Sequence, residues 1–203
     1  WALTLPSARK VPWVVHWQSD VVVSNIKWSV TLAYMVYRPF EQALLERAQQ
    51  VFVTSPPYLQ ASSALKRWRD KCAVVPLGIN LRGIPPAQTL EASLRWRPET
   101  TLRLLSIGRL TYYKGFETLI SAVASLPGVE LLIAGNGELR ETLQAQIDSV
   151  TSLGSPPATR LLGSVDDGQK HSLLEQCELF CLASRERTEA FGMVLLEAMQ
   201  HAK

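Results

Sequence analysis

A glycine and two basic residues, Gly108, Arg109 and Lys114, stand between an apolar run and a helical pattern. Because glycine carries no side chain, a ligand can approach its backbone closely, and a guanidinium can hold two oxygen atoms of one ligand at once. A lysine near a helix N-terminus adds charge to backbone N–H groups that already favour anions. These residues predict a binding turn for a phosphate or diphosphate. The alternative is that both basic residues are ordinary surface charges on a loop.

A second turn, with Gly135 and Gly137, follows the apolar run 129–134 and precedes another helical pattern. It begins like a dinucleotide-binding fingerprint. However, Arg140 stands where that fingerprint needs a small residue, and no suitably placed acidic residue follows about 20 positions later. The sequence therefore disfavours a nicotinamide dinucleotide. It leaves open whether these glycines contact a ligand or only make a tight turn.

Two glutamates eight positions apart, Glu189 and Glu197, flank Phe191 and Gly192 near the predicted start of a helix. Eight helical residues rise about 12 Å, so the two carboxylates cannot hold a single atom. They can accept hydrogen bonds from two separate hydroxyl-bearing parts of a long ligand, with free backbone N–H groups between them. The alternatives are that Glu189 only interacts with the helix dipole and that Glu197 lies at the boundary of an apolar helix face.

Short apolar runs alternate with amphipathic stretches along the whole chain, which is the pattern of a mostly parallel α/β sheet. In such a sheet the turns that follow the strands lie on the ligand-binding edge. We expect strands at 12–17, 50–54, 73–76, 102–107, 129–134, 160–162 and 179–183. The helical region after the first strand should break at Arg38-Pro39, because proline disfavours a helical residue before it. The apolar face beyond this break would consist of Phe40, Leu44, Leu45 and Ala48.

Residues 83–98 contain a glycine and three prolines but no core-forming run, and they predict a domain boundary. We therefore expect an N-terminal unit at 1–97 and a C-terminal unit at 98–203. Each supplies three or four strands where such sheets average about five or six. Both units are thus expected to be truncated, and weak ligand binding is a safer expectation for this chain alone than turnover.

The composition is that of an ordinary globular protein, with 47% hydrophobic and 19% charged residues. The net charge of +3 is too small to indicate nucleic acid as a partner, although basic residues outnumber acidic ones two to one in the first hundred positions. That basic half suits an anionic membrane or an acidic substrate, or is an ordinary solvated surface. The residues that could dock at an anionic membrane interface are Arg9, Lys10, Lys27, Trp28 and the run Lys66-Arg67-Trp68-Arg69-Asp70-Lys71.

No apolar run approaches the roughly 18 residues of a transmembrane helix, so we expect a soluble or peripheral protein. The three cysteines, Cys72, Cys177 and Cys181, are too few for a disulfide framework and favour a reducing compartment. Nothing near them completes a four-ligand metal set. We interpret Cys177 and Cys181 as buried thiols.

Together these segments resemble the family 4 retaining glycosyltransferases of GT-B fold, especially bacterial mannosyltransferase-like members that act on surface polysaccharides. The motifs that carry the resemblance are Gly108-Arg109 with Lys114-Gly115, Gly135-x-Gly137-x-Leu139, Glu189-x7-Glu197, His16-Trp17-Gln18-Ser19-Asp20 and Val75-Pro76-Leu77-Gly78-Ile79-Asn80. They span nearly the whole chain, and their order and spacing make the combination specific. The resemblance implies an α/β, GT-B-like fold with two Rossmann-like parallel-sheet units.

The resemblance also implies a role for each candidate residue. Arg109 and Lys114 would bind the donor diphosphate, Glu189 would bind hydroxyls of the transferred sugar, and Glu197 would bind the ribose. His16 would reach the donor sugar and the acceptor, and Val165 would offer backbone groups to the base. The catalytic candidates are therefore His16, Arg109, Lys114 and Glu189. The substrate-binding candidates are Gly108, Arg109, Lys114, Gly135, Gly137, Val165, Glu189, Phe191, Gly192 and Glu197.

We expect a retaining hexosyltransferase that moves a mannose- or glucose-type sugar from a nucleoside diphosphate to a saccharide or lipid-linked acceptor in polysaccharide biosynthesis. The leaving nucleoside diphosphate is anionic, and cationic side chains would stabilise it. The sequence has no Asp-x-Asp pair, so we expect neither a metal nor a cofactor. The expected location is cytoplasmic, with peripheral contact at the inner face of the plasma membrane. The alternatives are a nucleotide-binding module without turnover and an NAD-dependent oxidoreductase, which Arg140 disfavours.

Overall fold

The computed structural model describes residues 6, 10–21, 28–80, 85–86, 88–151, 158–186, 189 and 191–203. It divides the chain into two compact units. The first unit consists of Trp1–Leu77 with Arg187–Phe191, and the second consists of Gly78–Glu186 with Gly192–Lys203. Each unit is described by itself below.

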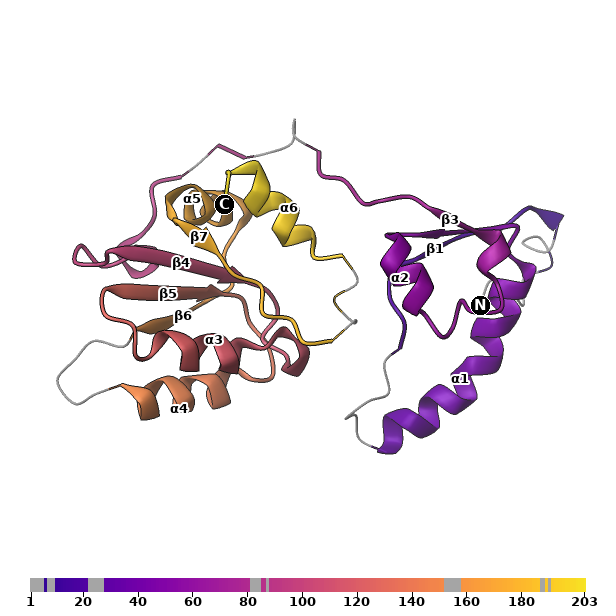
Figure 1. Ribbon diagram of the computed structural model, residues 1–203, viewed down its shortest axis with the longest axis horizontal. Coiled ribbons are helices and arrows are strands. Elements are labelled where there is room, and N and C mark those ends of the chain that lie inside the picture. Colours follow the sequence, from indigo (N-terminus) through magenta and orange to yellow (C-terminus); the bar gives the residue numbers. More distant parts are fainter. Residues whose placement is uncertain are drawn as a thin grey trace. The chain divides into compact units, whose positions relative to one another are not determined.

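The first unit is built on a three-stranded parallel sheet in the order β1-β2-β3 (Figure 1). Its elements in chain order are β1 (Val14–Trp17), α1 (Trp28–Arg47), β2 (Gln50–Val53), α2 (Pro56–Ala61) and β3 (Cys72–Val74). In the central strand β2, half-buried and fully buried residues alternate, and Val51 and Val53 are the fully buried ones. They pack with Trp17, Leu45 and Leu65 in one core.

Helix α1 is continuous through Pro39, so the predicted break at Arg38-Pro39 is wrong. Proline removes one backbone donor from the helix, and here the residues on both sides of it stay helical. The apolar face also differs from the prediction, because Phe40 is 60% exposed while Glu41 is buried. Leu45 and Ala48 are buried as expected, four and seven positions after Glu41.

The second unit contains a four-stranded parallel sheet in the order β6-β5-β4-β7. Its strands are β4 (Leu102–Ile107), β5 (Val129–Ala134), β6 (Thr159–Gly163) and β7 (Leu179–Phe180). Its helices are α3 (Phe116–Val123), α4 (Arg140–Val150), α5 (Asp167–Gln176) and α6 (Met193–Gln200). The parallel α/β class and all seven strand positions agree with the expectation from the sequence, with shifts of a few residues at the ends.

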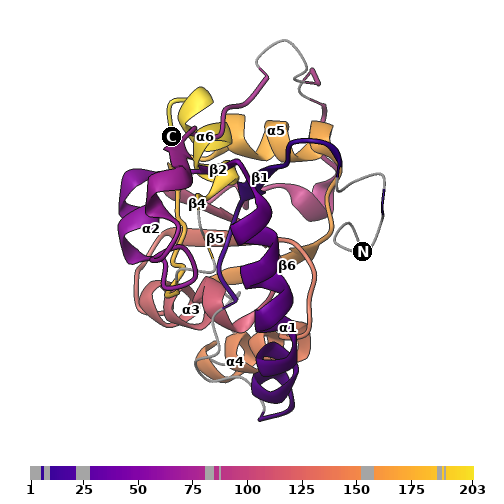
Figure 2. The same cartoon turned by 90° about the vertical axis from the view of Figure 1, so that its right-hand side faces the viewer.

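Helices cover both faces of this second sheet, with α3 and α4 on one side and α5 and α6 on the other (Figures 1 and 2). Neighbouring residues of β4 point to opposite faces. Leu104 packs with Phe116 and Ile120 of α3, whereas Leu105 packs with Leu173 of α5 and with Ala198 of α6. Burial on both faces explains why consecutive residues of β4 and β5 are apolar, such as Leu104-Leu105 and the run 131–134.

The boundary between the units lies at Leu77/Gly78, shortly before the stretch 83–98 in which the sequence predicted it. Residues 83–98 were interpreted as a boundary because they contain no core-forming run, yet Leu90, Leu94 and Trp96 within this stretch are each at most 8% exposed. They pack against the α5 and α6 face of the second sheet. The apolar residues in this stretch are widely spaced and show no helical or strand period, so periodicity alone could not identify them.

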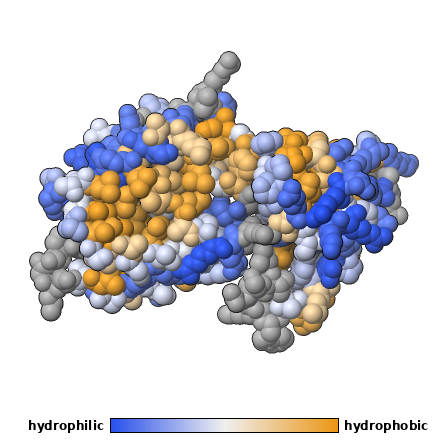
Figure 3. Space-filling view, in the orientation of Figure 1, coloured by the Kyte–Doolittle hydropathy of each residue, from blue (hydrophilic) through white to orange (hydrophobic). Residues whose placement is uncertain are grey.

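The surface carries hydrophobic residues among hydrophilic ones on the visible face of each unit (Figure 3). Within the described ranges, none of the helices combines the length and apolar character that crossing a membrane requires. All three cysteines are free thiols; Cys177 is buried, and Cys181 is half-buried.

Candidate functional site

Two glycine-containing turns meet at the carboxyl ends of the adjacent strands β4 and β5. The Gly108 backbone N–H donates to the carbonyl of Ala134 at 3.0 Å. Farther along the turn, the Leu110 N–H donates to the Asn136 carbonyl at 2.9 Å, and the Leu110 carbonyl accepts from Leu139 at 3.1 Å. Backbone hydrogen bonds therefore fix the two turns to each other at the edge where α/β sheets bind ligands.

Glycine is required at two positions of this contact. Gly135 has a φ of +141°, and a Cβ there would overlap the carbonyl oxygen of Gly108. A Cβ at Gly137 would likewise overlap backbone atoms of Leu110. These glycines thus allow one turn to pack against the other.

The Lys114 side chain lies along the Gly108 backbone. A Cβ built at Gly108 would be 3.3 Å from Lys114 Cε and 3.4 Å from its Nζ, and Lys114 is only 8% exposed. The ammonium group also lies 5.8 Å from the ring centroid of Tyr113. The short 3-10 helix Tyr112–Lys114 and the left-handed Gly115 that follows it give this lysine its position. A positive charge beside a glycine backbone is suited to an anion.

Arg109 projects outward from the same turn. Its side chain is 74% exposed, and its guanidinium is 3.7 Å from the carboxylate of Glu138. A hydrogen bond from Thr111 is the largest contribution that lowers the pKa of Glu138, and the charge of Arg109 adds to it. One carboxylate and one guanidinium therefore face each other where the two turns meet.

The loop after β7 runs beside the β4 turn. The Ser106 hydroxyl at the end of β4 donates to the Cys181 carbonyl at 2.7 Å, and the Arg185 N–H donates to the Tyr113 carbonyl at 2.8 Å. A Cβ at Gly115 would overlap the Ala183 carbonyl. Three strand ends thus converge, which places the β7 loop next to the turn with Arg109 and Lys114.

Glu197 projects from α6 toward α5. Its Oε1 accepts a hydrogen bond from Lys170 Nζ at 2.9 Å. Both side chains line a cavity of about 280 Å³, and Asn80 and Gln200 line it as well. Gly192 begins this helix with a φ of +71°. Glu197 was a candidate from the sequence and Lys170 was not, because nothing in a sequence indicates which residues of two separate helices will meet.

The candidate residues fall into two groups. Those in the second unit are Gly108, Arg109, Lys114, Gly135, Gly137, Val165, Gly192 and Glu197. Those in the first unit are His16, Glu189 and Phe191. His16 lies exposed on β1, and Glu189 and Phe191 are half-buried. Half-buried Val165 packs beside the core under α5, directly before the residue that caps this helix.

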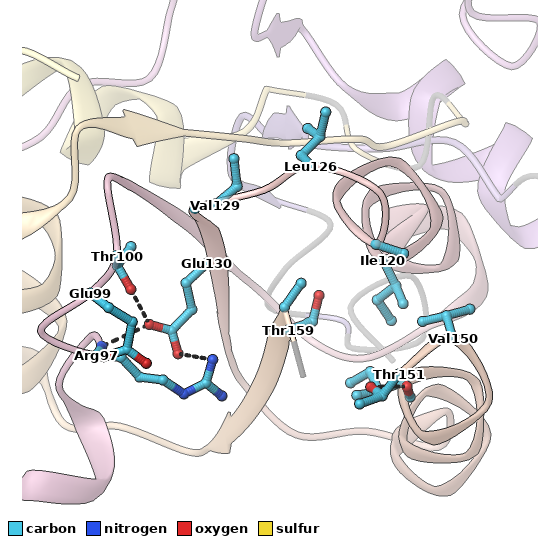
Figure 4. Close-up of a pocket in the computed structure, with 14 residues that line it drawn as sticks. Arg97, Glu99, Thr100, Ile120, Leu126, Val129, Glu130, Val150, Thr151 and Thr159 are labelled. Atoms are coloured by element: carbon cyan, nitrogen blue, oxygen red, sulfur yellow. Dashed lines mark hydrogen bonds and ion pairs between the residues drawn. The ribbon is translucent and has the colours of Figure 1, made fainter. Parts of the chain in front are cut away.

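A second cavity, of about 300 Å³, lies at the amino ends of the strands in the second unit (Figure 4). Beside it the buried Glu130 carboxylate accepts hydrogen bonds from the Arg97 backbone at 2.8 Å, the Thr100 hydroxyl at 2.9 Å and the Arg160 guanidinium at 2.8 Å. Burial raises the pKa of Glu130, but these hydrogen bonds outweigh it and the pKa is lowered. Because this end of the sheet is opposite the glycine turns, we assign the Glu130 cluster to stability rather than ligand binding.

The two parallel α/β units, together with the fold they share with two solved structures described below, define the fold class as GT-B-like. Residues 94–203 match the family model of the group 1 glycosyl transferases, and residues 1–78 match the glycosyl transferase 4-like domain. The chain belongs to the group 1 glycosyl transferase family. In the described part of the chain, no group of three or more His, Cys, Asp or Glu side chains could hold a metal ion.

Among curated relatives, the chain is 31% identical to D-rhamnosyltransferase WbpZ of Pseudomonas aeruginosa, across 95% of this chain and 48% of the relative. It is 28% identical to O-antigen chain mannosyltransferase C of Escherichia coli, across 98% of this chain and 49% of the relative. The chain thus spans about half the length of these curated relatives.

Two solved structures have the same fold. One is Anabaena HepE in complex with UDP and glucose, with 19% identity, a TM-score of 0.67 and coverage of 97% of this chain and 53% of that one. The other is sucrose-phosphate synthase of Thermosynechococcus elongatus, with 26% identity, a TM-score of 0.65 and coverage of 92% and 47%.

Proposed function

We propose that the whole protein is a retaining, metal-independent glycosyltransferase. It would move a hexose of mannose or glucose type from a nucleoside diphosphate sugar to a saccharide or lipid-linked acceptor in polysaccharide biosynthesis. The observation that carries the proposal is the pair of docked glycine turns with Lys114 buried along Gly108. The names of the two bacterial relatives support a sugar such as mannose or rhamnose, and the complex of HepE with UDP and glucose supports a nucleotide-sugar donor.

The proposed chemistry follows from charge. Cleavage of the glycosyl phosphate bond leaves an anionic nucleoside diphosphate and a sugar with cationic character. Arg109 and Lys114 would stabilise the negative charge that develops on the diphosphate in the transition state. This stabilisation lowers the barrier because it is stronger in the transition state than in the ground state. The absence of an Asp-x-Asp pair from the sequence supports positive side chains, rather than a metal ion, in this role.

The other candidate residues are proposed to position the donor and acceptor. Glu189 would bind hydroxyls of the transferred sugar, the backbone at Phe191 and Gly192 would lie near that sugar, and Glu197 would bind the ribose. Val165 would offer its backbone to the base. His16 would act at the donor sugar and acceptor. These roles rest on the family to which the chain belongs.

The proposed location is cytoplasmic, at the inner face of the plasma membrane. Support comes from the basic run 66–71 of the first unit, where the Arg67 guanidinium lies 5.1 Å from the Trp68 ring centroid. Lys71 instead donates to the carbonyl of Glu46 in the last turn of α1 and to that of Ala48 just after the helix, so it has a structural role as well. Arg9 and Lys27 lie outside the described residues. Flotation with liposomes should then require anionic lipid, and equal recovery with neutral liposomes would contradict the location.

A transfer assay with the whole protein tests the proposed function. Sugar nucleotides and lipid-linked acceptors should yield a glycosylated product, and Arg109→Ala should slow transfer by about 10²- to 10³-fold. Arg38→Ala, an exposed arginine of α1, serves as the control and should retain the rate. Nucleotide binding without any transfer would indicate a binding module, and reduction of NAD would indicate an oxidoreductase. Either result would overturn the proposal.

A further inference from the structure

Lys170 lies between two carboxylates of the second unit. Its Nζ is 2.9 Å from Glu197 Oε1 and 3.1 Å from an oxygen of Asp167. The Asp167 side chain belongs to the same helix and is 76% exposed, whereas Glu197 comes from α6 and is 24% exposed. Because surface ion pairs contribute little, the shielded contact with Glu197 is the stronger constraint, and it joins two helices.

The first turn of α5 fixes the position of Lys170. Asp166 caps this helix by accepting from the Gln169 N–H at 2.8 Å, and the Gln169 side chain accepts from the Asp166 N–H at 3.0 Å. The Lys170 N–H then donates to the Asp166 carbonyl at 2.9 Å. This reciprocal capping box orders the turn from which the lysine side chain projects.

Lys170 stays positively charged in this setting. Burial lowers the pKa of its ammonium group, but the hydrogen bonds to Glu197 and Asp167 outweigh burial and raise the pKa. A nucleoside diphosphate is an anion, and an unpaired carboxylate near it would repel it and would lose solvation as the ligand covers it. The lysine removes that repulsion by pairing with Glu197.

The pair leaves Glu197 able to accept from a ligand. Within the described residues, the hydrogen bond from Lys170 engages Oε1, and Oε2 accepts none. Both side chains line the 280 Å³ cavity, so the carboxylate faces open space. A carboxylate with a fixed orientation suits a vicinal diol, because each hydroxyl can donate to one oxygen.

We propose that Lys170 is a positioning residue that orients the Glu197 carboxylate for the ribose hydroxyls of the donor nucleotide. The inference rests on the proposed function, because ribose binding by Glu197 is part of that proposal. It adds that recognition of the ribose depends on a residue of another helix that need not touch the ligand.

Calorimetry on the whole protein with UDP and 2′-deoxy-UDP tests this role, and GDP with 2′-deoxy-GDP covers a purine base. The native protein should bind a ribonucleotide about tenfold or more tightly than its deoxy form, because the deoxy form lacks a hydrogen bond to a charged group. Lys170→Met should bring that ratio close to one. Lys170→Arg should restore it, and Asp167→Asn should leave it unchanged because Asp167 does not contact Glu197 in the described structure.

The ratio of the two affinities separates positioning from folding, because a fraction of unfolded protein reduces the signal for both nucleotides equally. If Lys170→Met yields no folded protein, Lys170→Gln removes the charge with a shorter polar side chain and should lower the ratio in the same way. In a Glu197→Gln background the ratio should already be near one, and Lys170→Met should not change it further.

The outcomes distinguish the two proposals. If the native protein binds no nucleotide, the proposed function fails. A second case is that the native protein binds nucleotides and prefers the ribose form. If the Lys170 variants then keep that preference, or bind both nucleotides more weakly by the same factor, the role of Lys170 is overturned and the proposed function stands. If the native protein binds the ribose and deoxyribose forms equally, Glu197 does not recognise the ribose, and the role of Lys170 is overturned with it.

Discussion

Gly135 packs against Gly108 so closely that a side-chain carbon at position 135 would overlap the Gly108 carbonyl oxygen. The two residues nevertheless differ in what they tolerate. A side-chain carbon at Gly108 would meet only the end of the flexible Lys114 side chain, at 3.3 Å. The contact between the β4 and β5 turns therefore requires glycine on one side and only favours it on the other.

This asymmetry predicts different effects of alanine at the two positions. Gly135→Ala should lower the free energy of unfolding by at least about 2 kcal/mol, because a strained φ alone costs about 1–3 kcal/mol and the overlap adds to it. Gly108→Ala should lower it by less than about 1 kcal/mol, since the lysine can move. Urea unfolding followed by tryptophan fluorescence measures both. Equal losses would contradict the packing described here.

The ion pair between Arg109 and Glu138 predicts that a negative charge weakens diphosphate binding. Hydrogen bonding by Thr111 and the charge of Arg109 lower the pKa of Glu138, so it is ionised at neutral pH. Glu138→Gln keeps an oxygen acceptor, removes the charge and frees Arg109, so UDP should bind a few-fold more tightly. The effect should be small because both side chains are largely exposed.

Salt provides the control for this prediction. Screening weakens interactions between exposed charges, so the gain in affinity of Glu138→Gln should shrink in calorimetric titrations as the salt concentration rises. Weaker binding of UDP by the variant at low salt would show that Glu138 supports the turn rather than opposing the anion.

The sequence was sufficient for the parallel α/β class and for the glycine turns, because both depend on local patterns. Apolar runs such as 129–134 are buried on both faces of a sheet and are easily recognised. Gly108 and Gly135 each follow a strand directly, and parallel strands end at the same edge, so their proximity was predictable from topology. The position of Pro39 inside α1 was not, because proline disfavours a helical residue before it but does not exclude one.

Contacts between distant segments could not be predicted from the sequence. Lys170 and Glu197 meet because α5 and α6 pack side by side on the same sheet face. Glu130 lies within the apolar strand β5, and a carboxylate in such a run is itself a sign of buried partners. Those partners, Arg97, Thr100 and Arg160, lie about 30 residues away on both sides of it.

The hydrogen bonds that Asp20 accepts predict that this residue stabilises the first unit. One of its carboxylate oxygens accepts hydrogen bonds from the Trp17 indole at 2.8 Å, the Tyr58 hydroxyl at 2.9 Å and the Ser62 hydroxyl at 2.7 Å. Asp20→Ala leaves these mostly buried donors without their acceptor and should cost about 2–4 kcal/mol. Thermal unfolding measures the loss. Glu46→Ala, which removes an exposed carboxylate of α1, should change stability by less than about 0.5 kcal/mol.

Glu130 predicts a dependence of stability on acid pH. Its pKa in the folded protein lies below the usual value near 4.5, because hydrogen bonds from the Arg97 backbone, Arg160 and Thr100 outweigh burial. The unfolded chain therefore binds a proton more readily, so the stabilisation is complete above about pH 4.5 and is lost as the pH falls through the folded pKa. Glu130→Gln removes the buried negative charge that pairs with the Arg160 guanidinium and should cost about 3–5 kcal/mol near neutral pH.

The control for Glu130 is another glutamate paired with arginine, but at the surface. The Glu178 carboxylate pairs with Arg103, with 39% and 40% of their side chains exposed. Hydrogen bonding by Arg103 lowers the pKa of Glu178 as well, yet an exposed pair contributes only about 0–1 kcal/mol. Urea unfolding between pH 7 and 3 should therefore show a smaller decline in Glu130→Gln than in the native protein, and nearly the native decline in Glu178→Gln. Parallel curves for the native protein and Glu130→Gln would mean that the acid sensitivity arises elsewhere.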